Sequence, residues 1–279
     1  MAATVFDSRP LVTRMTGELR KEAARFRQQH HRPARLTQLV AGHDPAAELY
    51  RRQLLRSCRE IGLDCTTLAY PFEIQEEDLR AEVATASHDA TIDGVVLLLP
   101  LPAHIRQRIV TDVLSPEKDV DGLGSRNAGN LLLGFPSFIP STADVILRIL
   151  RDAGIPVAGR HAVVVGRSNI GGKPTALVLM RLDATITICH SYTQDLASIT
   201  RSADILVVSM GQPSGITAAM VKPGAVVLDA GINAVDGKVV GDVDFNSVKE
   251  VASFLTPVPG GLGPLTHLML IRHTLVGPE

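Results

Sequence analysis

The chain has 279 residues, of which 45% are hydrophobic, and its formal net charge is −1. A near-neutral chain of this length buries an extended core, usually in two lobes, and has no excess of lysine and arginine to neutralise a nucleic-acid backbone. Its three cysteines stand in no metal-ligand spacing, and no apolar run approaches the roughly 20 residues of a membrane span. We therefore predict a cytoplasmic protein with a small-molecule partner, and no metal, nucleic acid or membrane.

Apolar runs alternate with helical patterns through the first half of the chain. The runs at 36–42, 65–70 and 94–100 are each followed by a segment with helical spacing of apolar residues. This alternation favours parallel strands, and continuously apolar runs are typical of strands covered by helices on both faces. The fold class predicted is therefore α/β. The charged segment 13–29, with one apolar stripe, predicts a helix packed on the first lobe.

A domain boundary is predicted near residue 140. Residues 115–140 hold glycine, proline, asparagine and aspartate without helical period, and a capped helix starts at Ser141 or Thr142. A second strand–helix series follows. We assign residues 1–140 to a first lobe and 141–264 to a second, doubly wound domain, with a last helix over 265–279.

The segment 159–182 predicts a strand, a glycine-containing turn and a helix, as in dinucleotide-binding domains. Gly166 and Gly172 let the backbone approach a pyrophosphate at the start of the helix, although their spacing departs from GxGxxG. Arg167 and Ser168 stand where they can hold a 2′-phosphate, and the next strand ends without an acidic residue for a ribose hydroxyl. This pattern favours NADP over NAD. A packing turn, a solvated arginine and, for Ser191, a strand-end cap are the alternatives.

Several motifs in fixed order from about residue 39 onward resemble the methylenetetrahydrofolate dehydrogenase/cyclohydrolase family. They are LPLP (99–102), SPEKDVDGL (115–123), VVVGRSNIGGKP (163–174), CHS (189–191), KPGAVVLDAGIN (222–233), GDVDF (241–245) and TPVPGGLGPLT (256–266). The resemblance implies a homodimer of two-domain chains, with a folate cleft between an N-terminal lobe and a Rossmann-like NADP domain. It also implies that the last helix returns to the first lobe.

The resemblance implies roles for individual residues as well. Asp121 would hold the pterin ring and Tyr50 would stack on the folate, while Pro259, Gly260 and Gly261 would wall the cleft. The cofactor NADP would be contacted by Gly166, Arg167, Ser168, Gly172, Ser191 and the main chain of Ile232. Taken without the resemblance, Asp121 reads as a turn former and Tyr50 as a core residue.

Two positions depart from the family pattern together. The resemblance implies a lysine for the cyclohydrolase step where this chain has Leu54, and its glutamine partner where this chain has Leu98. Replacing both partners of a polar pair by apolar groups is nearly neutral, whereas removing one costs about 1–3 kcal/mol. Ala47 and Glu48 also replace a serine and a glutamine, so the folate-binding surface is remodelled.

These departures predict NADP-dependent oxidation of a methylenetetrahydrofolate with cyclohydrolase activity lost or strongly reduced. Hydride transfer requires mainly alignment of two ligands, whereas hydrolysis of the methenyl product requires a positioned group for proton transfer, which leucine does not supply. Two alternatives stay open. One is a bifunctional enzyme in which Arg51, Arg52 or Arg56 replaces the lysine; the other is a folate- and NADP-binding pseudoenzyme.

Overall fold

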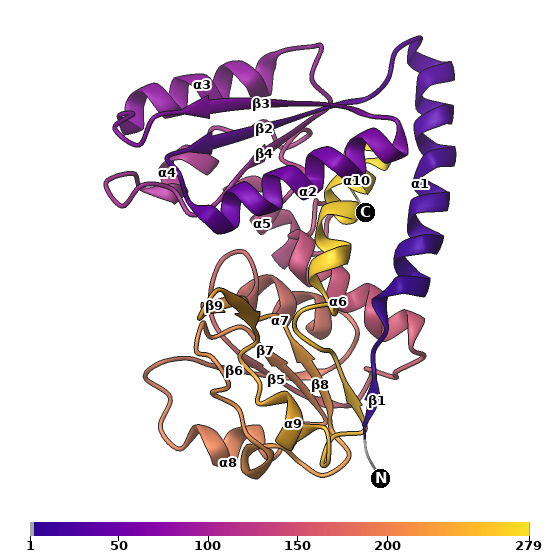
Figure 1. Cartoon of the computed structure of the whole chain (residues 1–279), viewed down its shortest axis with the longest axis vertical. Coiled ribbons are helices and arrows are strands. Elements are labelled where there is room, and N and C mark those ends of the chain that lie inside the picture. Colours follow the sequence, from indigo (N-terminus) through magenta and orange to yellow (C-terminus); the bar gives the residue numbers. More distant parts are fainter. Residues whose placement is uncertain (1–2, 279) are drawn as a thin grey trace. The chain divides into compact units, whose positions relative to one another are not determined.

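The computed structural model describes residues 3–278, apart from the side chain of Ala46, and these residues divide into two units (Figure 1). Residues 13–141 and 267–278 form the first unit, and residues 3–12 and 142–266 form the second. Each unit has its own parallel sheet. This two-lobed α/β architecture, with the end of the last helix in the first unit, confirms the predicted fold class.

The sheet of the first unit has the strand order β3-β2-β4, and all of its strands are parallel. The strands are β2 (Arg35–Ala41), β3 (Asp64–Tyr70) and β4 (Gly94–Leu97). Helix α3 (Glu76–His88) covers one face of this sheet and α2 (Pro45–Ile61) covers the other, as Figure 1 shows. Apolar side chains from the strands, α3 and the segment around α4 (Gln107–Thr111) form a buried core, including Leu39, Leu79, Val83, Val95, Leu97 and Val110.

Helix α2 has clear start and stop signals in its sequence. The carboxylate of Asp44 accepts a hydrogen bond from the Ala47 N–H at 2.8 Å, and Pro45 occupies the first turn, where its missing N–H costs nothing. Gly62 ends the helix with φ of 102°, and its N–H donates to the Cys58 carbonyl. The caps fix the length of α2 and therefore which of its side chains face the sheet.

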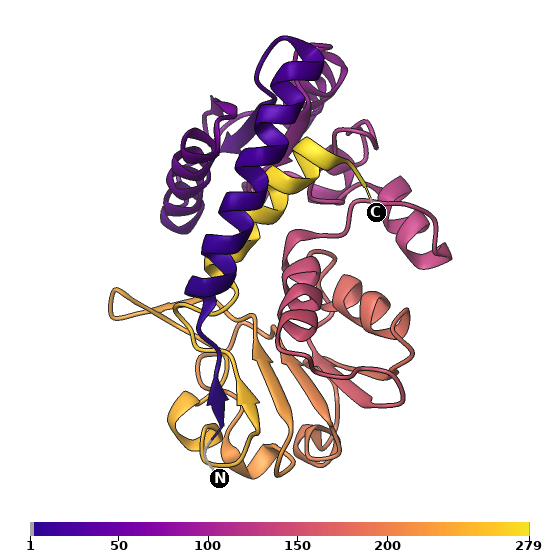
Figure 2. The same ribbon diagram turned by 90° about the vertical axis from the view of Figure 1, so that its right-hand side faces the viewer.

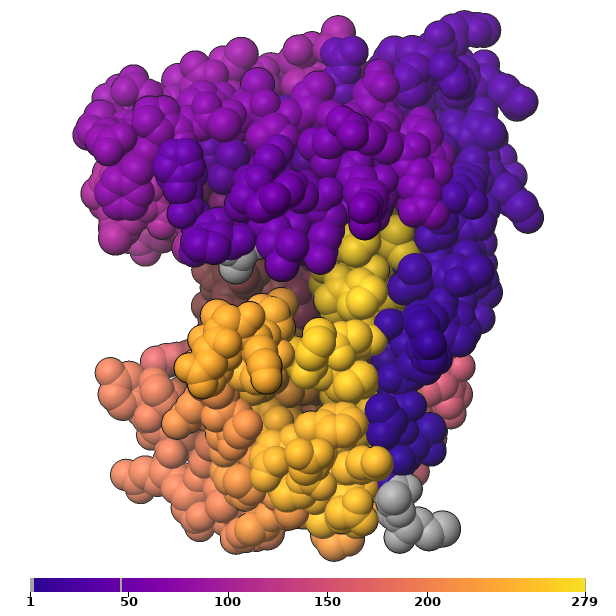
Figure 3. Space-filling view, in the orientation of Figure 1, coloured from indigo at the N-terminus to yellow at the C-terminus, as the bar shows by residue number. Residues whose placement is uncertain are grey.

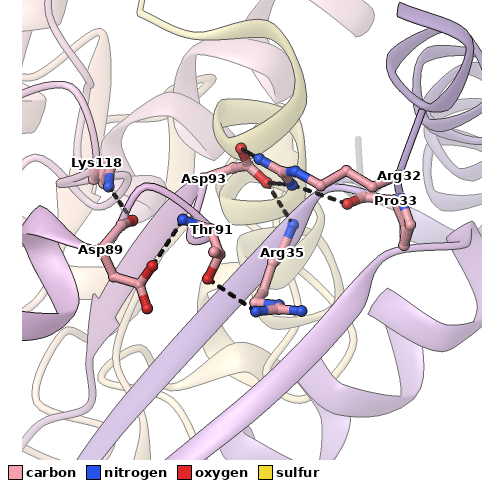
Figure 4. Close-up of polar contacts among 7 residues, drawn as sticks. All are labelled: Arg32, Pro33, Arg35, Asp89, Thr91, Asp93 and Lys118. Atoms are coloured by element: carbon pink, nitrogen blue, oxygen red, sulfur yellow. Dashed lines mark hydrogen bonds and ion pairs between the residues drawn. The ribbon is translucent and has the colours of Figure 1, made fainter. Parts of the chain in front are cut away.

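Polar contacts hold together the amino ends of β2 and β4 (Figure 4). The Asp93 carboxylate accepts hydrogen bonds from the guanidinium of Arg32 at 2.6 and 2.8 Å and from the Arg35 N–H at 2.7 Å. The Lys118 ammonium donates to the Asp89 carbonyl beside this group. These ion pairs and hydrogen bonds all lie at the amino ends of the strands, whereas parallel sheets bind ligands at the carboxyl ends.

Helix α10 (Gly263–Val276) contributes its second half to the first unit. The buried His273 donates from Nδ1 to the Val120 carbonyl at 2.7 Å, and its ring lies 5.5 Å from the Phe138 ring. Burial lowers the pKa of His267 to about 4, so this imidazole is neutral near pH 7. Neither histidine is on a solvent-exposed face of the unit.

The remaining elements of the first unit are helical. Most of α1 (Ser8–His30) belongs to it, and α5 (Ser125–Leu133) follows the glycine-rich loop after α4. The side chains of Leu11, Met15, Leu19 and Ala23 form one buried stripe on α1, which agrees with the predicted packing helix. No helix of residues 3–278 is both long and apolar enough to cross a membrane.

The second unit is built on a parallel sheet with the order β1-β11-β8-β7-β5-β6. Its strands are β1 (Thr4–Val5), β5 (His161–Val165), β6 (Thr185–Cys189), β7 (Ile205–Val208), β8 (Val226–Asp229) and β11 (Phe254–Leu255). Figure 2 shows the indigo strand β1 beside β11 at one edge. This pairing places residues 3–12 in the second unit, where the sequence-based division had assigned them to the first.

Helices and a hairpin complete the second unit. The helices are α6 (Ser141–Asp152), α7 (Gly172–Met180), α8 (Leu196–Thr200), α9 (Phe245–Val248) and the 3-10 turn η1 (Ala218–Met220). Strands β9 (Asn233–Val235) and β10 (Lys238–Val240) pair as an antiparallel hairpin. The central strands are buried except at the first residues of β5 and β8, as their apolar sequences predict, and their side chains include Val163, Val165, Leu206, Val208 and Val227.

Candidate active site

The two positions that motivated the functional prediction, Leu54 on α2 and Leu98 after β4, are both buried. Leu54 is fully buried and Tyr50, one turn earlier, is partly buried. Leu98 directly follows β4 with 4% of its surface exposed, and its N–H donates to the Leu39 carbonyl at 2.9 Å. Both leucines are therefore core residues of the first unit, and neither offers a proton donor or acceptor from its side chain.

The three arginines considered as substitutes for a lysine at position 54 are poorly placed for that role. Arg52 precedes Leu54 by two residues and Arg56 follows it by two. Each side chain therefore leaves the helix about 160° around its axis from that of Leu54. Together with Arg51, Leu55 and Arg59 they line a surface hollow on the solvent side of α2, the purple helix whose outer side is visible in Figure 3. Both side chains therefore point away from Leu54.

Arg51 is closer to the buried face, but its guanidinium is already paired. Its Nε and Nη2 each donate to the Glu48 carboxylate at 2.7 Å, and Nη1 lies 3.4 Å from the Thr67 hydroxyl. The hydrogen bonds to Glu48 raise the pKa of Arg51 further above its usual value. An arginine held in this way stays protonated and does not act as a general base.

A buried polar group beneath α2 escaped the sequence analysis. Gln38 is fully buried in β2 and donates from Nε2 to the Cys65 sulfur at 3.2 Å. The interaction of the Cys58 thiol with the neighbouring Cys65 thiol, together with burial, raises the pKa of Cys58. The same interaction lowers the pKa of Cys65. A single glutamine within an apolar strand was the only sequence signal for this cluster.

Asp119 and Asp121 have different environments although they are two residues apart. Asp119 is buried and accepts hydrogen bonds from the N–H groups of Leu123 and Gly124 and from the Asn127 amide, at 2.8–2.9 Å. Burial raises the pKa of Asp119 to about 6. Asp119 therefore has the turn-forming role that the sequence alone suggested for Asp121.

Asp121 is only partly buried and accepts the Ser141 N–H at 2.9 Å. Burial raises the pKa of its carboxyl, while hydrogen bonds from Ser141 oppose the shift. The next residue, Gly122, has φ of 61°, and a Cβ there would lie 2.2 Å from the Phe138 carbonyl oxygen. The backbone after Asp121 is thus constrained, and the residue itself keeps part of its surface exposed.

The predicted cofactor residues of the second unit lie at the carboxyl ends of its parallel strands. Residues 166–168 follow β5, Ser191 follows β6 and Ile232 follows β8. Because β8, β7, β5 and β6 are neighbours in the parallel sheet, these residues lie together along the side where the strands have their carboxyl ends. This is where open α/β sheets bind ligands.

The turn after β5 has the close backbone approach expected of a phosphate-binding loop. Gly166 has φ of 140°, and a Cβ there would lie 2.2 Å from the Ser209 carbonyl oxygen. A Cβ on Gly172 would lie 2.2 Å from the Gly166 carbonyl oxygen. The Ser168 hydroxyl accepts the N–H groups of Gly171 and Gly172 at 3.1 and 3.4 Å, so it also shapes the start of α7.

Arg167 and Ser191 are exposed at this edge. The guanidinium carbon of Arg167 lies 5.7 Å from the centre of the Tyr192 ring, so the arginine is oriented rather than freely solvated. The strand-end cap suggested as an alternative for Ser191 is made instead by Thr193, whose hydroxyl accepts the His190 N–H at 2.8 Å. Ile232 is 68% exposed.

Pro259, Gly260 and Gly261 lie after β11 in the second unit, and the bond before Pro259 is cis. Gly260 has φ of 100°, and its carbonyl accepts the Ser8 hydroxyl at 2.6 Å. A Cβ on Gly261 would lie 2.4 Å from the Pro257 carbonyl oxygen. A side chain at position 261 would therefore collide with the chain's own backbone, so glycine is needed there whether or not a ligand binds.

Comparison with known sequences assigns both units. Residues 6–121 match the profile described as "Tetrahydrofolate dehydrogenase/cyclohydrolase, catalytic domain", and residues 140–278 match that described as "Tetrahydrofolate dehydrogenase/cyclohydrolase, NAD(P)-binding domain". The chain belongs to this family. Among curated members of the tetrahydrofolate dehydrogenase/cyclohydrolase family, the "Bifunctional protein FolD" of Exiguobacterium sibiricum is 45% identical over 273 residues, covering 98% of each chain.

Solved structures of the family have the same fold. The bifunctional FolD of Campylobacter jejuni superposes with a TM-score of 0.95 at 35% identity, covering 99% of this chain and 98% of that one. The Trypanosoma brucei methylenetetrahydrofolate dehydrogenase-cyclohydrolase, crystallised with NADP and an inhibitor, gives a TM-score of 0.94 at 33% identity, covering 99% and 97%. The predicted family is thus confirmed, and with it an NAD(P)-binding domain.

Proposed function

We propose that this chain oxidises 5,10-methylenetetrahydrofolate to the 5,10-methenyl form with NADP⁺, and that its cyclohydrolase activity is lost or strongly reduced. The proposed loss of cyclohydrolase activity rests on the burial of Leu54 and Leu98 at positions where the family resemblance implies a lysine and its glutamine partner. The dehydrogenase clause is supported by Asp121, by partly buried Tyr50 and by the glycine turn after β5.

The residues of the second unit fit a bound NADP. The backbone around Gly166 and Gly172 leaves no room for a side chain, so a pyrophosphate can approach the positive end of α7 closely. Arg167 supplies a cation for the 2′-phosphate, and Ser191 a hydroxyl beside it. When bound, the nicotinamide supplies the hydride acceptor, and the protein contributes chiefly the alignment of the two ligands.

The bifunctional alternative is favoured by the names of the curated relatives, which are called bifunctional. Against it stand the orientations of Arg52 and Arg56 and the pairing of Arg51 with Glu48. A bifunctional enzyme would need another group for proton transfer. The pseudoenzyme alternative is disfavoured because the Asp121 carboxylate and the glycine turn after β5 are both present.

A progress curve separates these functions. Purified protein mixed with methylenetetrahydrofolate and NADP⁺ is expected to accumulate the methenyl product, which then decays at the rate seen without enzyme. Absorbance of the methenyl compound and of NADPH is followed in the same cuvette. Rapid enzyme-dependent loss of the methenyl signal would establish the bifunctional enzyme, and ligand binding without NADPH formation would establish the pseudoenzyme.

Arg167→Ala is expected to lower the NADP-over-NAD ratio of kcat/KM by about 10–100-fold, because a charged hydrogen bond is worth roughly 1.5–3 kcal/mol. The rate with NAD should change little. Arg181→Ala, an exposed arginine just after α7, is the matched control and should leave the ratio unchanged. An unchanged ratio in Arg167→Ala would assign the 2′-phosphate contact to another residue.

A further inference from the structure

Two buried carboxylates of the second unit hold a network that the motif comparison does not explain. Asp242 is fully buried, and its Oδ2 accepts the N–H groups of Met210 and Gly211 at 2.6 and 2.9 Å. Its Oδ1 accepts the Gln212 N–H at 2.8 Å. Three consecutive N–H groups of the loop after β7 therefore converge on one carboxylate, an arrangement that binds an anion strongly.

The same carboxylate reaches a second loop. Asp242 Oδ1 also accepts the Asn233 amide at 2.8 Å, at the end of the segment after β8. The second carboxylate, Asp229, is 3% exposed and accepts N–H groups of Gly231, Asp242 and Val243 at 2.9–3.1 Å. Burial raises the pKa of Asp229 to about 6, although these hydrogen bonds oppose the shift.

The backbone is fitted closely around both carboxylates. A Cβ on Gly241 would lie 1.9 Å from Asp229 Oδ2, and a Cβ on Gly231 would lie 2.3 Å from the Asp242 carboxyl carbon. Neither carboxylate has room to move without displacing a loop. The pair is therefore a rigid connection between the segment around Asp242 and the loop that ends at Gln212, 30 residues earlier in the chain.

The two connected loops lie at the edge of the sheet where the cofactor residues gather. Strand β7 lies between β5 and β8, so the loop at 210–212 is flanked by the turn at 166–168 and by the segment at 231–233. The second of these segments contains the exposed Ile232, one of the predicted cofactor residues. Displacing Asp242 would move both loops relative to Gly166.

We infer that Asp242, supported by Asp229, is a positioning residue for NADP, setting the loops at 210–212 and 231–233 without touching the cofactor. This inference rests on the proposed use of NADP. Asp242→Asn retains one accepting oxygen and places an NH₂ group against two N–H donors. Because misplacement by about 1 Å costs up to 10²-fold, we expect the Kd for NADPH to rise roughly 10–100-fold.

The experiment compares Asp242→Asn with Asp204→Asn by titrating NADPH fluorescence and, separately, a folate. Asp204 is a matched control because it accepts the His161 N–H at 3.0 Å and pairs with Lys222 at 2.7 Å, at the amino ends of β5 and β7. Both variants should lose thermal stability. Only Asp242→Asn should weaken NADPH binding, and neither should change the Kd of the folate by more than about twofold.

Asn233→Ala provides a second variant that leaves both carboxylates in place and removes the hydrogen bonds of the Asn233 amide to Asp242 and to the Val240 carbonyl. Its Kd for NADPH should rise by a smaller factor, on the order of threefold to tenfold. If Asp242→Asn fails to fold, the Kd of Asn233→Ala for NADPH tests the inference instead. Unchanged NADPH affinity in a folded Asp242→Asn protein, or in Asn233→Ala, would overturn the inference, whereas absence of NADPH binding in the unaltered protein would overturn the proposed cofactor instead.

Discussion

Replacing Leu54 by lysine and Leu98 by glutamine together is expected to raise the rate of methenyl hydrolysis by about 10²–10⁴-fold, the usual contribution of a positioned proton-transfer group. Both side chains are needed. A lysine alone at the fully buried position 54 would be an unpaired buried charge, which is strongly destabilising, whereas a glutamine partner satisfies it. Decay of the methenyl absorbance, corrected for the rate without enzyme, measures the gain.

Leu55→Lys is the matched control for this double variant. It adds the same charge one residue later, on the side of α2 that faces the arginine-lined hollow, and should leave hydrolysis unchanged. The single Leu54→Lys variant should unfold at lower urea concentration than the double variant. If the double variant folds, oxidises the methylene substrate and still fails to hydrolyse the product, then more of the hydrolytic site than these two residues has been lost.

Asp121→Asn is expected to lower kcat/KM for the methylene substrate by about 10²–10³-fold. Removing a charge from a hydrogen-bonded ligand contact costs roughly 2–5 kcal/mol, and the amide that replaces it faces the Ser141 N–H with either its oxygen or its NH₂ group. The Kd for NADPH should stay within about twofold of the unaltered value. Steady-state kinetics at saturating NADP⁺, with a separate NADPH titration, measures both quantities.

Asp119→Asn distinguishes a substrate contact from a loop-forming contact. Asp119 accepts three hydrogen bonds within its own loop, so its replacement should lower the free energy of unfolding by about 1–3 kcal/mol. The kinetic constants of the folded fraction should change much less than in Asp121→Asn. Equal kinetic losses in both variants would indicate that Asp121 acts by holding the loop.

The sequence predicted the sheets and most helices because their signals are local. Continuous apolar runs marked the central strands, and the capping signals of Asp44, Pro45 and Gly62 at the ends of α2 are also local, although we did not use them for prediction. Strand β1 escaped prediction, since two residues have no periodicity and its partner lies about 250 residues away. The orientations of Arg52 and Arg56 followed from helical geometry alone, because residues two positions from Leu54 point to the opposite side of a helix.

The residues of the candidate site that lie in a motif could be predicted from the sequence. The contacts made by long-range hydrogen bonds could not. Arg167 was identified from its place after a strand, but its contact with Tyr192 depends on the neighbouring strand. Asp229 and Asp242 lie in motifs that supported the family resemblance, yet their partners are backbone N–H groups up to 32 residues away. Side-chain identity gives no sign of such a contact, because any residue can supply the N–H.

The pairing of β1 with β11 has a consequence for synthesis on the ribosome. Residues 3–12 are synthesised long before β11, at 254–255, with which they join a sheet. The segment 13–141 waits in turn for residues 267–278, which supply His273 beneath Val120. Although domains generally fold in order of synthesis, the first unit is incomplete before residues 267–278 are translated, and the second before β11. The translation speed over the codons for residues 254–278 therefore bears on both units at once.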